Sequence, residues 1–511
     1  MELTAENRHQ FDREEFYGDF AITLGWQQNF SRYRLSSYFL TKCGSASVGL
    51  NAADGAAAVS DIRASDLGLS TTFSGSAWLC PKYQDFIADF DLYLAWDEFI
   101  QGLWTELRIP FVHSRWNAGL GTSVSAAGGD NYAFEVDGDS EAQYAVIEAA
   151  GGPTPVVYTG NCALSSALLG NSAFGDAPRL AAGKMVNCTK TANGLGGIRL
   201  EVGYDFLRRE RGSMGLALDV QFPVANKPAK NNCCCDLYTF DPKVGSQHAW
   251  KVGGVLRAQY MLWDRDESKR IDMYFDGRVA GSFSGETTRL LGLQANNTTL
   301  FNQYLLLKKY SVSGDVATYQ GLERAANKLT ARVKAKYSTE AQVTLMFQYR
   351  NGGYVGNLGW NFFGRGEEKL CLKCLCNADD YYYTIKGDRP VRLNADGSEG
   401  GFYSPSDSNI NQTGDVKGES ETWAAITATE VTENAITFTN SCSTTCGNGN
   451  ISLCPAAHPR YISNTIFGAL GYHWDDVDWK PYLGVLGKVD LGSSNTALRL
   501  WGIYLKGGIC F

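Results

Sequence analysis

The stretch IRLEVGYDFLRRERGSMGLALDVQF, residues 198–222, decides the fold. Apolar side chains occupy every second position on both sides of a charged turn, with polar or small residues between them. Successive side chains of a strand point to opposite faces, so the pattern predicts a β-hairpin with one apolar and one polar face. A strand of a soluble sheet spans about five or six residues, whereas one that crosses a bilayer needs about nine to eleven. These two runs have the longer length, which favours strands that cross a membrane.

The same alternation recurs along the whole chain. It is found at 19–27, 85–96, 103–111, 250–262, 271–279, 329–337, 343–349 and 358–362, and in three segments between residue 460 and the end. Asn351-Gly352 between two alternating runs is a strong hairpin signal. Single-chain bacterial barrels have an even number of strands. We therefore expect an all-β fold, a transmembrane antiparallel up-and-down β-barrel of about 16–18 strands.

Short and long connections alternate between these runs. RRERGS and RNGG are short, whereas residues 117–195, 223–247, 365–380, 387–420 and 441–458 are long and polar. Membrane barrels have short periplasmic turns and long extracellular loops. We expect an N-terminal segment, 1–18, and a single barrel domain, 19–511. Loop 117–195 is too long to lack structure, and we expect it to fold into the pore or to cap it.

Composition excludes several classes of protein. The chain has 511 residues, 56 of them Gly and 26 Tyr, with 20% charged residues and a net charge of −8. No basic footprint for nucleic acid is present, and no apolar run reaches the length of a membrane helix. A large soluble β-sandwich or propeller remains the alternative. The start, MELTAENRHQ, lacks the features of a signal peptide, so we expect that an export signal has been removed.

The last segment, WGIYLKGGICF (501–511), ends on Phe511 after alternating apolar residues. It resembles the C-terminal assembly signal of Gram-negative outer-membrane β-barrel proteins. The strand pattern as a whole resembles porins, and segments such as 198–228 and 354–370 are similar to uncharacterised porin-like proteins of host-dependent bacteria. This resemblance implies an outer-membrane location, contact with outer-membrane lipid, insertion by the barrel-assembly machinery and a homotrimer. It implies neither a cofactor nor an enzymatic activity.

Residues on the polar faces of the predicted strands would line the pore. Rings of one charge sign set the ion preference of a channel, and opposed signs create a field across it. Because the two signs are nearly balanced here, we expect weak ion selectivity. The candidate pore-lining residues are Asp85, Asp89, Asp91, Glu106, Arg108, Lys251, Arg257, Asp272, Asp276, Arg278, Arg332 and Lys334.

Fourteen cysteines lie mainly in the polar connections. An even number in loops favours disulfides in an oxidising compartment. Thiolate zinc ligation by Cys371, Cys374 and Cys376 is the alternative, although no histidine lies at ligand spacing beside them. The cysteine-rich loops are similar to those of chlamydia-type major outer-membrane proteins.

Two other functions stay open. The first is a structural role, in which disulfides between loops link neighbouring barrels into an envelope lattice. The second is a hydrolase on a barrel scaffold, with His113 and Ser114, or His473 with Asp475 and Asp476, as fragments of a site. No serine lies in a G-x-S-x-G turn, which favours rim positions for these histidines. We expect a porin without a catalytic or metal site, a passive diffusion channel for small hydrophilic solutes and ions.

Overall fold

A computed structural model describes residues 16–32, 34, 36, 45–49, 62–67, 69, 73–126, 134–136, 161–171, 178–224, 237–238, 242–245, 249–265, 269–293, 304–337, 339–375, 379–386, 391–393, 409–410, 428–436, 447–448, 451–453, 456–474, 479–493 and 498–511. No helix in these ranges has the length and apolar character needed to cross a membrane.

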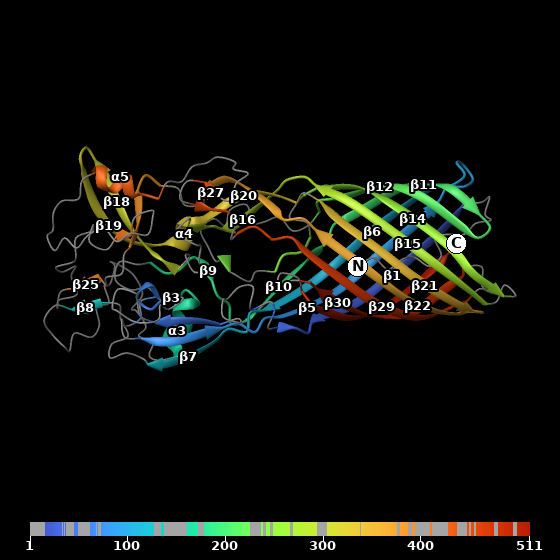
Figure 1. The fold of residues 1–511 in the computed structure, drawn as a ribbon, viewed down its shortest axis with the longest axis horizontal. Helices are drawn as coiled ribbons and strands as arrows, with labels where there is room; N and C mark the ends of the chain where they lie inside the picture. The colour runs from blue at the N-terminus through green and yellow to red at the C-terminus, as the bar shows by residue number, and fades with distance from the viewer. Residues whose placement is uncertain are drawn as a thin grey trace.

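Twelve antiparallel strands close into a barrel (Figure 1). Neighbours in the ring follow chain order, and the ring closes because β1 pairs with β31 on one side and with β5 on the other. Closure leaves no sheet edge, which satisfies the backbone groups within the wall. The strands are β1 (Tyr17–Asn29), β5 (Lys82–Ala95), β6 (Leu103–Asn117), β11 (Ile198–Arg209), β12 (Gly212–Phe222), β14 (Lys251–Arg265), β15 (Lys269–Ser282), β21 (Glu340–Asn351), β22 (Tyr354–Arg365), β29 (Tyr461–His473), β30 (Pro481–Gly492) and β31 (Leu500–Cys510).

The expected barrel is confirmed, and the hairpin at 198–222 forms β11 and β12. The expected 16–18 strands are wrong, because some alternating runs extend barrel strands beyond the ring. Residues 330–337 form β20, which continues into β21, and both keep one register against β15 and the strand that follows it, β16 (Gly285–Leu290). In the same way β22 continues into β23 (Glu368–Leu375), which pairs with β20. Three wall strands therefore run on past the barrel, and the run 329–337 was counted as a separate strand although it continues into β21.

One further strand, β10 (Thr189–Leu195), joins the wall without belonging to the ring. It pairs with residues 111–117 of β6, nearer the cap, whereas β11 pairs with residues 103–108. Between them, Gly196 donates its backbone N–H to the Pro110 carbonyl at 2.8 Å, and Gly197 has a φ of 131°. Pro110 has no N–H to return to the ladder, and Gly197 adopts a backbone conformation that favours glycine. The chain is therefore interrupted between β10 and β11, which form two separate strands.

The long connections fold together at one end of the barrel, on the left in Figure 1. Parts of the loop between β6 and β10 contribute β7, α3 and β9 to this layer, which we call the cap. The described cap elements are β2 (Ser45–Gly49), β3 (Ile62–Arg63), η2 (Ser65–Leu67), β4 (Ser74–Trp78), β7 (Gly121–Ala126), β8 (Phe134–Val136), α3 (Asn161–Leu168), β9 (Ala182–Lys184), β13 (Leu237–Tyr238), β16, β17 (Gly292–Leu293), β18 (Leu306–Ser313), β19 (Val316–Arg324), α4 (Ala325–Leu329), β20, β23, β24 (Tyr382–Lys386), β25 (Val391–Leu393), β26 (Asn409–Ile410), α5 (Ala428–Asn434), β27 (Gly447–Asn448) and β28 (Ile451–Ser452).

The cap has hydrophobic cores of its own. One core brings together Val48, Phe73, Leu164 and Leu180, which come from two different connections. A second core contains Leu307, Leu329 and Val333 of a third connection, among others. Burial of such side chains stabilises a fold by about 1.5–3 kcal/mol each. The long loops therefore form a packed layer, although much of their sequence is polar.

Two side chains at α4, Arg324 just before it and Asn327 within it, join their own connection to those that follow β1 and β6. Arg324 donates to the Asp66 carbonyl at 2.6 Å and to the Pro178 carbonyl at 3.0 Å. Asn327 accepts hydrogen bonds from the backbone N–H groups of Ala181, at 2.7 Å, and Ala182, at 3.2 Å. Burial lowers the pKa of Arg324 to about 10, so the guanidinium stays charged at neutral pH. We call Arg324 and Asn327 the loop clamp.

Replacing Asn327 by alanine is expected to loosen the cap and to leave the barrel intact. Asn327 is buried, and its loss leaves two backbone N–H groups without their acceptor, which costs about 1–3 kcal/mol each. Limited proteolysis should then cut the connections around 178–182 faster than in the wild type. Val316→Ala, at an exposed cap position, is the control. Equal cleavage rates in both variants would show that the clamp does not hold the loops.

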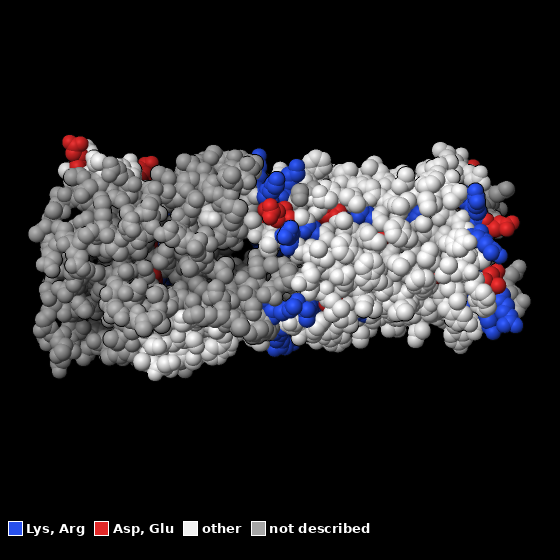
Figure 2. Space-filling model, viewed as in Figure 1, with Lys and Arg blue, Asp and Glu red and all other residues white. Residues whose placement is uncertain are grey.

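The outer face of the barrel is an apolar belt. Large side chains such as Leu216, Leu358, Ile466 and Leu470 are 54–76% exposed there. Figure 2 shows a largely uncharged surface over the barrel, with Lys, Arg, Asp and Glu gathered at its two ends. A soluble protein does not expose apolar area on this scale, whereas a bilayer covers it. The barrel is therefore transmembrane.

Aromatic side chains gather at both ends of this belt. At the long-loop end Trp26 packs against Trp501, with ring centroids 5.1 Å apart, and at the short-turn end Tyr472 packs against Trp474. Trp116, near the end of β6, differs from these, since it packs against the inward-facing Tyr83. Amphipathic rings suit the headgroup level of a bilayer.

Candidate functional site: the barrel lumen

Ten of the twelve predicted pore-lining residues face the inside of the barrel. Burial alternates along each strand, with apolar residues exposed outside and polar residues covered inside. The inward set is Asp85, Asp89, Asp91, Glu106, Arg108, Lys251, Arg257, Asp272, Asp276 and Arg278. Whether these side chains conduct solutes stays a prediction.

Arg332 and Lys334 correct the expectation, because neither lies in the barrel. Both are on β20, where Ala331, Val333 and Ala335 are buried in the second cap core. Arg332 and Lys334 occupy the opposite face, and Lys334 is exposed. The alternation was read correctly, but here the apolar face packs on the cap interior and the charged face looks outward.

The centre of the lumen holds a cluster of charges around Arg257. Its Nη2 lies 2.5 Å from Glu106 Oε2 and 2.6 Å from Glu201 Oε2, and its guanidinium lies 4.3 Å from the Trp104 ring centroid. Arg257 Nε is 3.6 Å from Asp276. All of these side chains except Asp276 are at least nine-tenths buried. We call this group the central cluster.

Arg108 extends the central cluster along the wall. It pairs with Glu106 at 2.9 Å and with Asp91 at 3.2 Å. Glu106 thus bridges two arginines on neighbouring levels of the barrel. Charges buried in this way are stable only when they are paired and hydrogen-bonded. The cluster therefore ties β5, β6, β11, β14 and β15 together through their inward side chains.

A second cluster lies closer to the cap. Arg278 binds Asp219 through Nη2 at 2.5 Å and Nε at 2.8 Å, and Arg199 lies 3.5 Å from the same carboxylate. Lys251 pairs with Glu340 at 2.8 Å. Most of the charged groups on this side of the lumen have a partner of opposite sign, which fits the expected balance of charge.

The opposite wall is less charged. Lys488 pairs with Asp490 at 3.2 Å, Tyr504 donates to Gln27 at 2.8 Å, and Tyr482 donates to Asp19 at 2.9 Å. Sequence reasoning did not select these residues, nor Arg199, Glu201, Asp219 or Glu340. The signal was present, since each occupies an inward position of the same two-residue alternation. For Arg199, Glu201 and Asp219 it was clear, because they lie on the polar face of the 198–222 hairpin, whereas glycines and aromatic residues weaken the contrast between the faces around Lys488 and Tyr504.

Inward glycines lie opposite inward aromatic rings on adjacent strands. Gly25 pairs with Tyr504, Gly203 with Trp104, and Gly359 with Phe467. A Cβ atom at any of these glycines would overlap the partner ring, so each ring lies flat across its glycine. We call these three pairs the glycine seats. They keep bulky rings against the wall instead of across the lumen.

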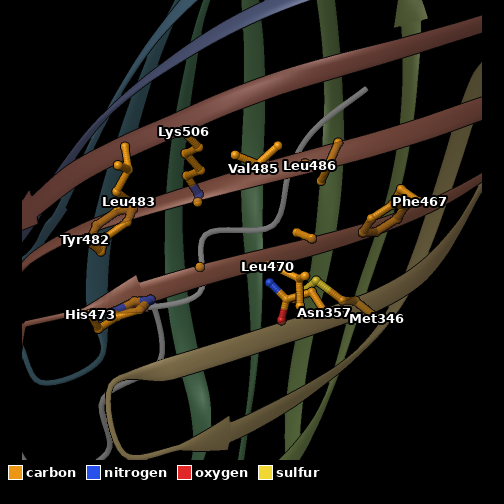
Figure 3. Close-up of a pocket in the computed structure, with 13 residues that line it drawn as sticks. Met346, Asn357, Phe467, Leu470, His473, Tyr482, Leu483, Val485, Leu486 and Lys506 are labelled. Atoms are coloured by element: carbon orange, nitrogen blue, oxygen red, sulfur yellow. The ribbon is translucent and has the colours of Figure 1, made fainter.

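A small hollow in the inner wall is visible in Figure 3. It lies between β21, β22, β29, β30 and β31 near the short-turn end, and Met346, Asn357, His473 and Lys506 are among its lining residues. Gly471 and Gly484, which pair in register, leave its floor without side chains. Its volume of about 30 Å³ corresponds to about one water molecule. The hollow is too small for a larger solute.

Replacing Gly25 by alanine is expected to lower the free energy of unfolding by about 1–3 kcal/mol, because the methyl group displaces the Tyr504 ring. The ring would then tilt into the lumen, so single-channel conductance should also fall. Gly487→Ala is the control, since a Cβ atom there meets no atom within 4 Å. Urea unfolding in lipid vesicles and current recordings measure the two effects. Identical behaviour of both variants would contradict the glycine-seat explanation.

Comparison with solved structures finds outer-membrane β-barrel channels. The COG4313 outer membrane channel from Pseudomonas putida F1 aligns over 100% of both chains, with a TM-score of 0.38 and 10% identity. A FadL homologue from Pseudomonas aeruginosa aligns over 97% of this chain and 88% of its own, with a TM-score of 0.26 and 8% identity. OprB of Pseudomonas putida aligns over 98% of this chain and 94% of its own, with a TM-score of 0.22 and 8% identity. No family model matches the chain, and no curated protein matches it.

His113, one of the two histidines considered for a hydrolase, is separated from its proposed partner. His113 lies on the outer face of β6 next to Asn193, and Ser114 points inward, so the two cannot act together. His473 stacks on Tyr482 at 5.1 Å between ring centroids. Asp475 and Asp476 lie outside the described residues.

The described cysteines differ in the bonding state of their sulfur atoms. Cys80 and Cys188 have free thiols, whereas Cys371 is disulfide-bonded. A disulfide sulfur is not a thiolate ligand, which weakens the zinc alternative for Cys371. Among the described residues no group of three or more His, Cys, Asp or Glu side chains could hold a metal ion. Cys376 and the side chain of Cys374 lie outside the described part.

Proposed function

We propose that this chain is a bacterial outer-membrane channel through which small hydrophilic solutes and ions diffuse passively. One observation carries the proposal. The same strands expose an apolar belt to the outside and hold Asp, Glu, Arg and Lys side chains on the inside of a closed barrel. Ionised groups inside a membrane need water or partners, and they mark the path of polar solutes. The belt supports insertion in lipid, and the charged interior supports a polar path.

The central cluster supports a narrow path with a small conductance. Its side chains reach inward from five strands, and most of them are buried. Ions would pass between paired charges of both signs, so neither cations nor anions would be strongly favoured. Small polar solutes would pass by the same route, and bulky ones would be excluded.

Planar lipid bilayers test the proposal. The detergent-purified protein should give discrete single-channel steps in potassium chloride, with a reversal potential close to zero under a salt gradient. A heat-denatured sample is the control for detergent leaks. The absence of steps from a folded, inserted barrel would overturn the channel proposal, and a strong preference for one ion sign would overturn the weak selectivity.

Assembly by the barrel-assembly machinery and a trimeric state belong to the same proposal. Phe511 is 42% exposed, and its backbone exchanges two hydrogen bonds with Gly18 at the point where β1 and β31 close the ring. A terminal residue with an exposed ring at this seam suits recognition before closure. Deleting Phe511 should lower the amount of folded barrel in the outer membrane, and crosslinking of the purified protein should report three copies.

A further inference from the structure

Arg365 differs from the other inward arginines of the barrel near the cap. It is the last residue of β22, and its guanidinium carbon lies 4.2 Å from the ring centroid of Tyr337 and 4.7 Å from that of Tyr461. The three residues come from β22, β20 and β29 and meet at the long-loop end of the barrel. Arg365 shares the inward face of β22 with Asn361 and Phe363, so it belongs to the mouth of the lumen.

Within the described part of the chain, no carboxylate lies within ion-pair distance of Arg365, and its buried Nε atom has no hydrogen-bond acceptor. The two nearest acids on neighbouring strands are occupied. Glu340, which is opposite Arg365 in the ladder, pairs with Lys251 at 2.8 Å. Glu368 accepts the backbone N–H of His458 at 2.9 Å and lies 3.4 Å from Arg289.

His458, in the connection before β29, adds no charge near Arg365. Burial is the main cause that lowers the pKa of His458 to about 4; Arg289 lowers it further, Glu368 raises it, and Arg365 has a smaller lowering effect. His458 is therefore neutral at pH 7.

A guanidinium recognises a carboxylate through two parallel N–H donors, and aromatic contacts fix the plane of those donors beforehand. We propose that Arg365, held by Tyr337 and Tyr461, is a recognition point for small carboxylate solutes at the mouth of the channel. The solute would supply the carboxylate that Arg365 lacks among the described residues. This inference rests on the proposed channel for its role in transport, but the binding site itself does not require conduction.

Acetate is the probe for the test, and saturation-transfer NMR of its methyl group on the detergent-purified protein is the first measurement. We expect binding to the wild type and a loss of affinity of about tenfold or more in Arg365→Gln, because a charge-assisted pair is lost. Arg365→Lys keeps the charge without the planar donors and should also bind more weakly. Lys336→Gln removes the same charge from the exposed outer face beside Tyr337 and should leave acetate binding unchanged.

The second measurement is the block of single-channel current by acetate at constant ionic strength. Wild-type current should be interrupted by acetate added on the cap side, and Arg365→Gln should remove these interruptions. Binding without any channel current would overturn the channel and leave the site in place. Channel current with equal acetate binding in the wild type and Arg365→Gln would overturn the site and leave the channel in place. A loss of stability in Arg365→Gln with unchanged acetate binding would show a purely structural role and also overturn the site.

Discussion

Replacing Arg257 by methionine is expected to lower the free energy of unfolding by about 3–5 kcal/mol, the largest effect among luminal substitutions. The change removes the cation that lies 2.5 Å from Glu106 and 2.6 Å from Glu201, and both carboxylates are buried. Glu106 keeps its pair with Arg108 at 2.9 Å, whereas Glu201 is left as a buried carboxylate without Arg257. Urea unfolding in lipid vesicles, followed by tryptophan fluorescence, measures the loss.

Two further variants separate charge from packing in this experiment. Arg209→Met, at an exposed position of β11 beside the short turn, is the matched control and should change stability by less than about 0.5 kcal/mol. Adding Glu201→Gln to Arg257→Met removes the carboxylate left without its partner and should restore part of the stability. A loss below about 1 kcal/mol in Arg257→Met alone would show that the central cluster does not stabilise the barrel.

Replacing Ile466 by arginine is expected to destabilise the barrel by about 2–4 kcal/mol in lipid. Ile466 lies near the middle of β29, points outward and is 54% exposed, so the new charge would enter the apolar core of the bilayer. Ile462→Arg is the matched control on the same face, four residues closer to the cap, where the effect should fall to about 0–1 kcal/mol.

The depth dependence is the decisive part of that measurement. Equal effects at Ile462 and Ile466 in vesicles would contradict a bilayer around the belt. A further check uses detergent, where a micelle adapts to the surface and the difference between the two variants should shrink. A protein that stayed dispersed without detergent would contradict the transmembrane interpretation altogether.

Two-residue alternation was sufficient to predict the barrel and the inward direction of most candidate residues. At 198–222 the pairing of β11 with β12 was predicted, but a register shift between Asp205 and Leu207 places Glu201 opposite Asp219, one residue away from the partner that the turn alone indicates. The position of each side chain along the barrel axis could not be predicted, because it depends on how neighbouring strands are staggered around a closed ring. For this reason the contact of Arg257 with Glu106, 151 residues apart, could not be predicted.

The predicted number of barrel strands was wrong for a related reason. Alternation in 329–337 is as regular as in true ring strands, because Ala331, Val333 and Ala335 pack on a hydrophobic core inside the cap. A core of that kind and a lipid bilayer impose the same pattern on a strand. The packing of several connections into one cap could not be predicted, since Val48 lies far from Leu164 and Leu180 in the sequence and meets them only in three dimensions.

The three wall strands that continue past the ring have a mechanical consequence. The pairing of β15, β21 and β22 continues at the same register into β16, β20 and β23, with one shift further out, between Arg332 and Val333. A lid tied on by slack linkers could swing clear of an entrance, whereas on this side strands run directly from the embedded cylinder into the covering layer. Widening of the entrance is therefore expected on the flank built by the connections after β1 and β6. Solutes would then enter off-centre, while the strands that carry Arg365 stay in place.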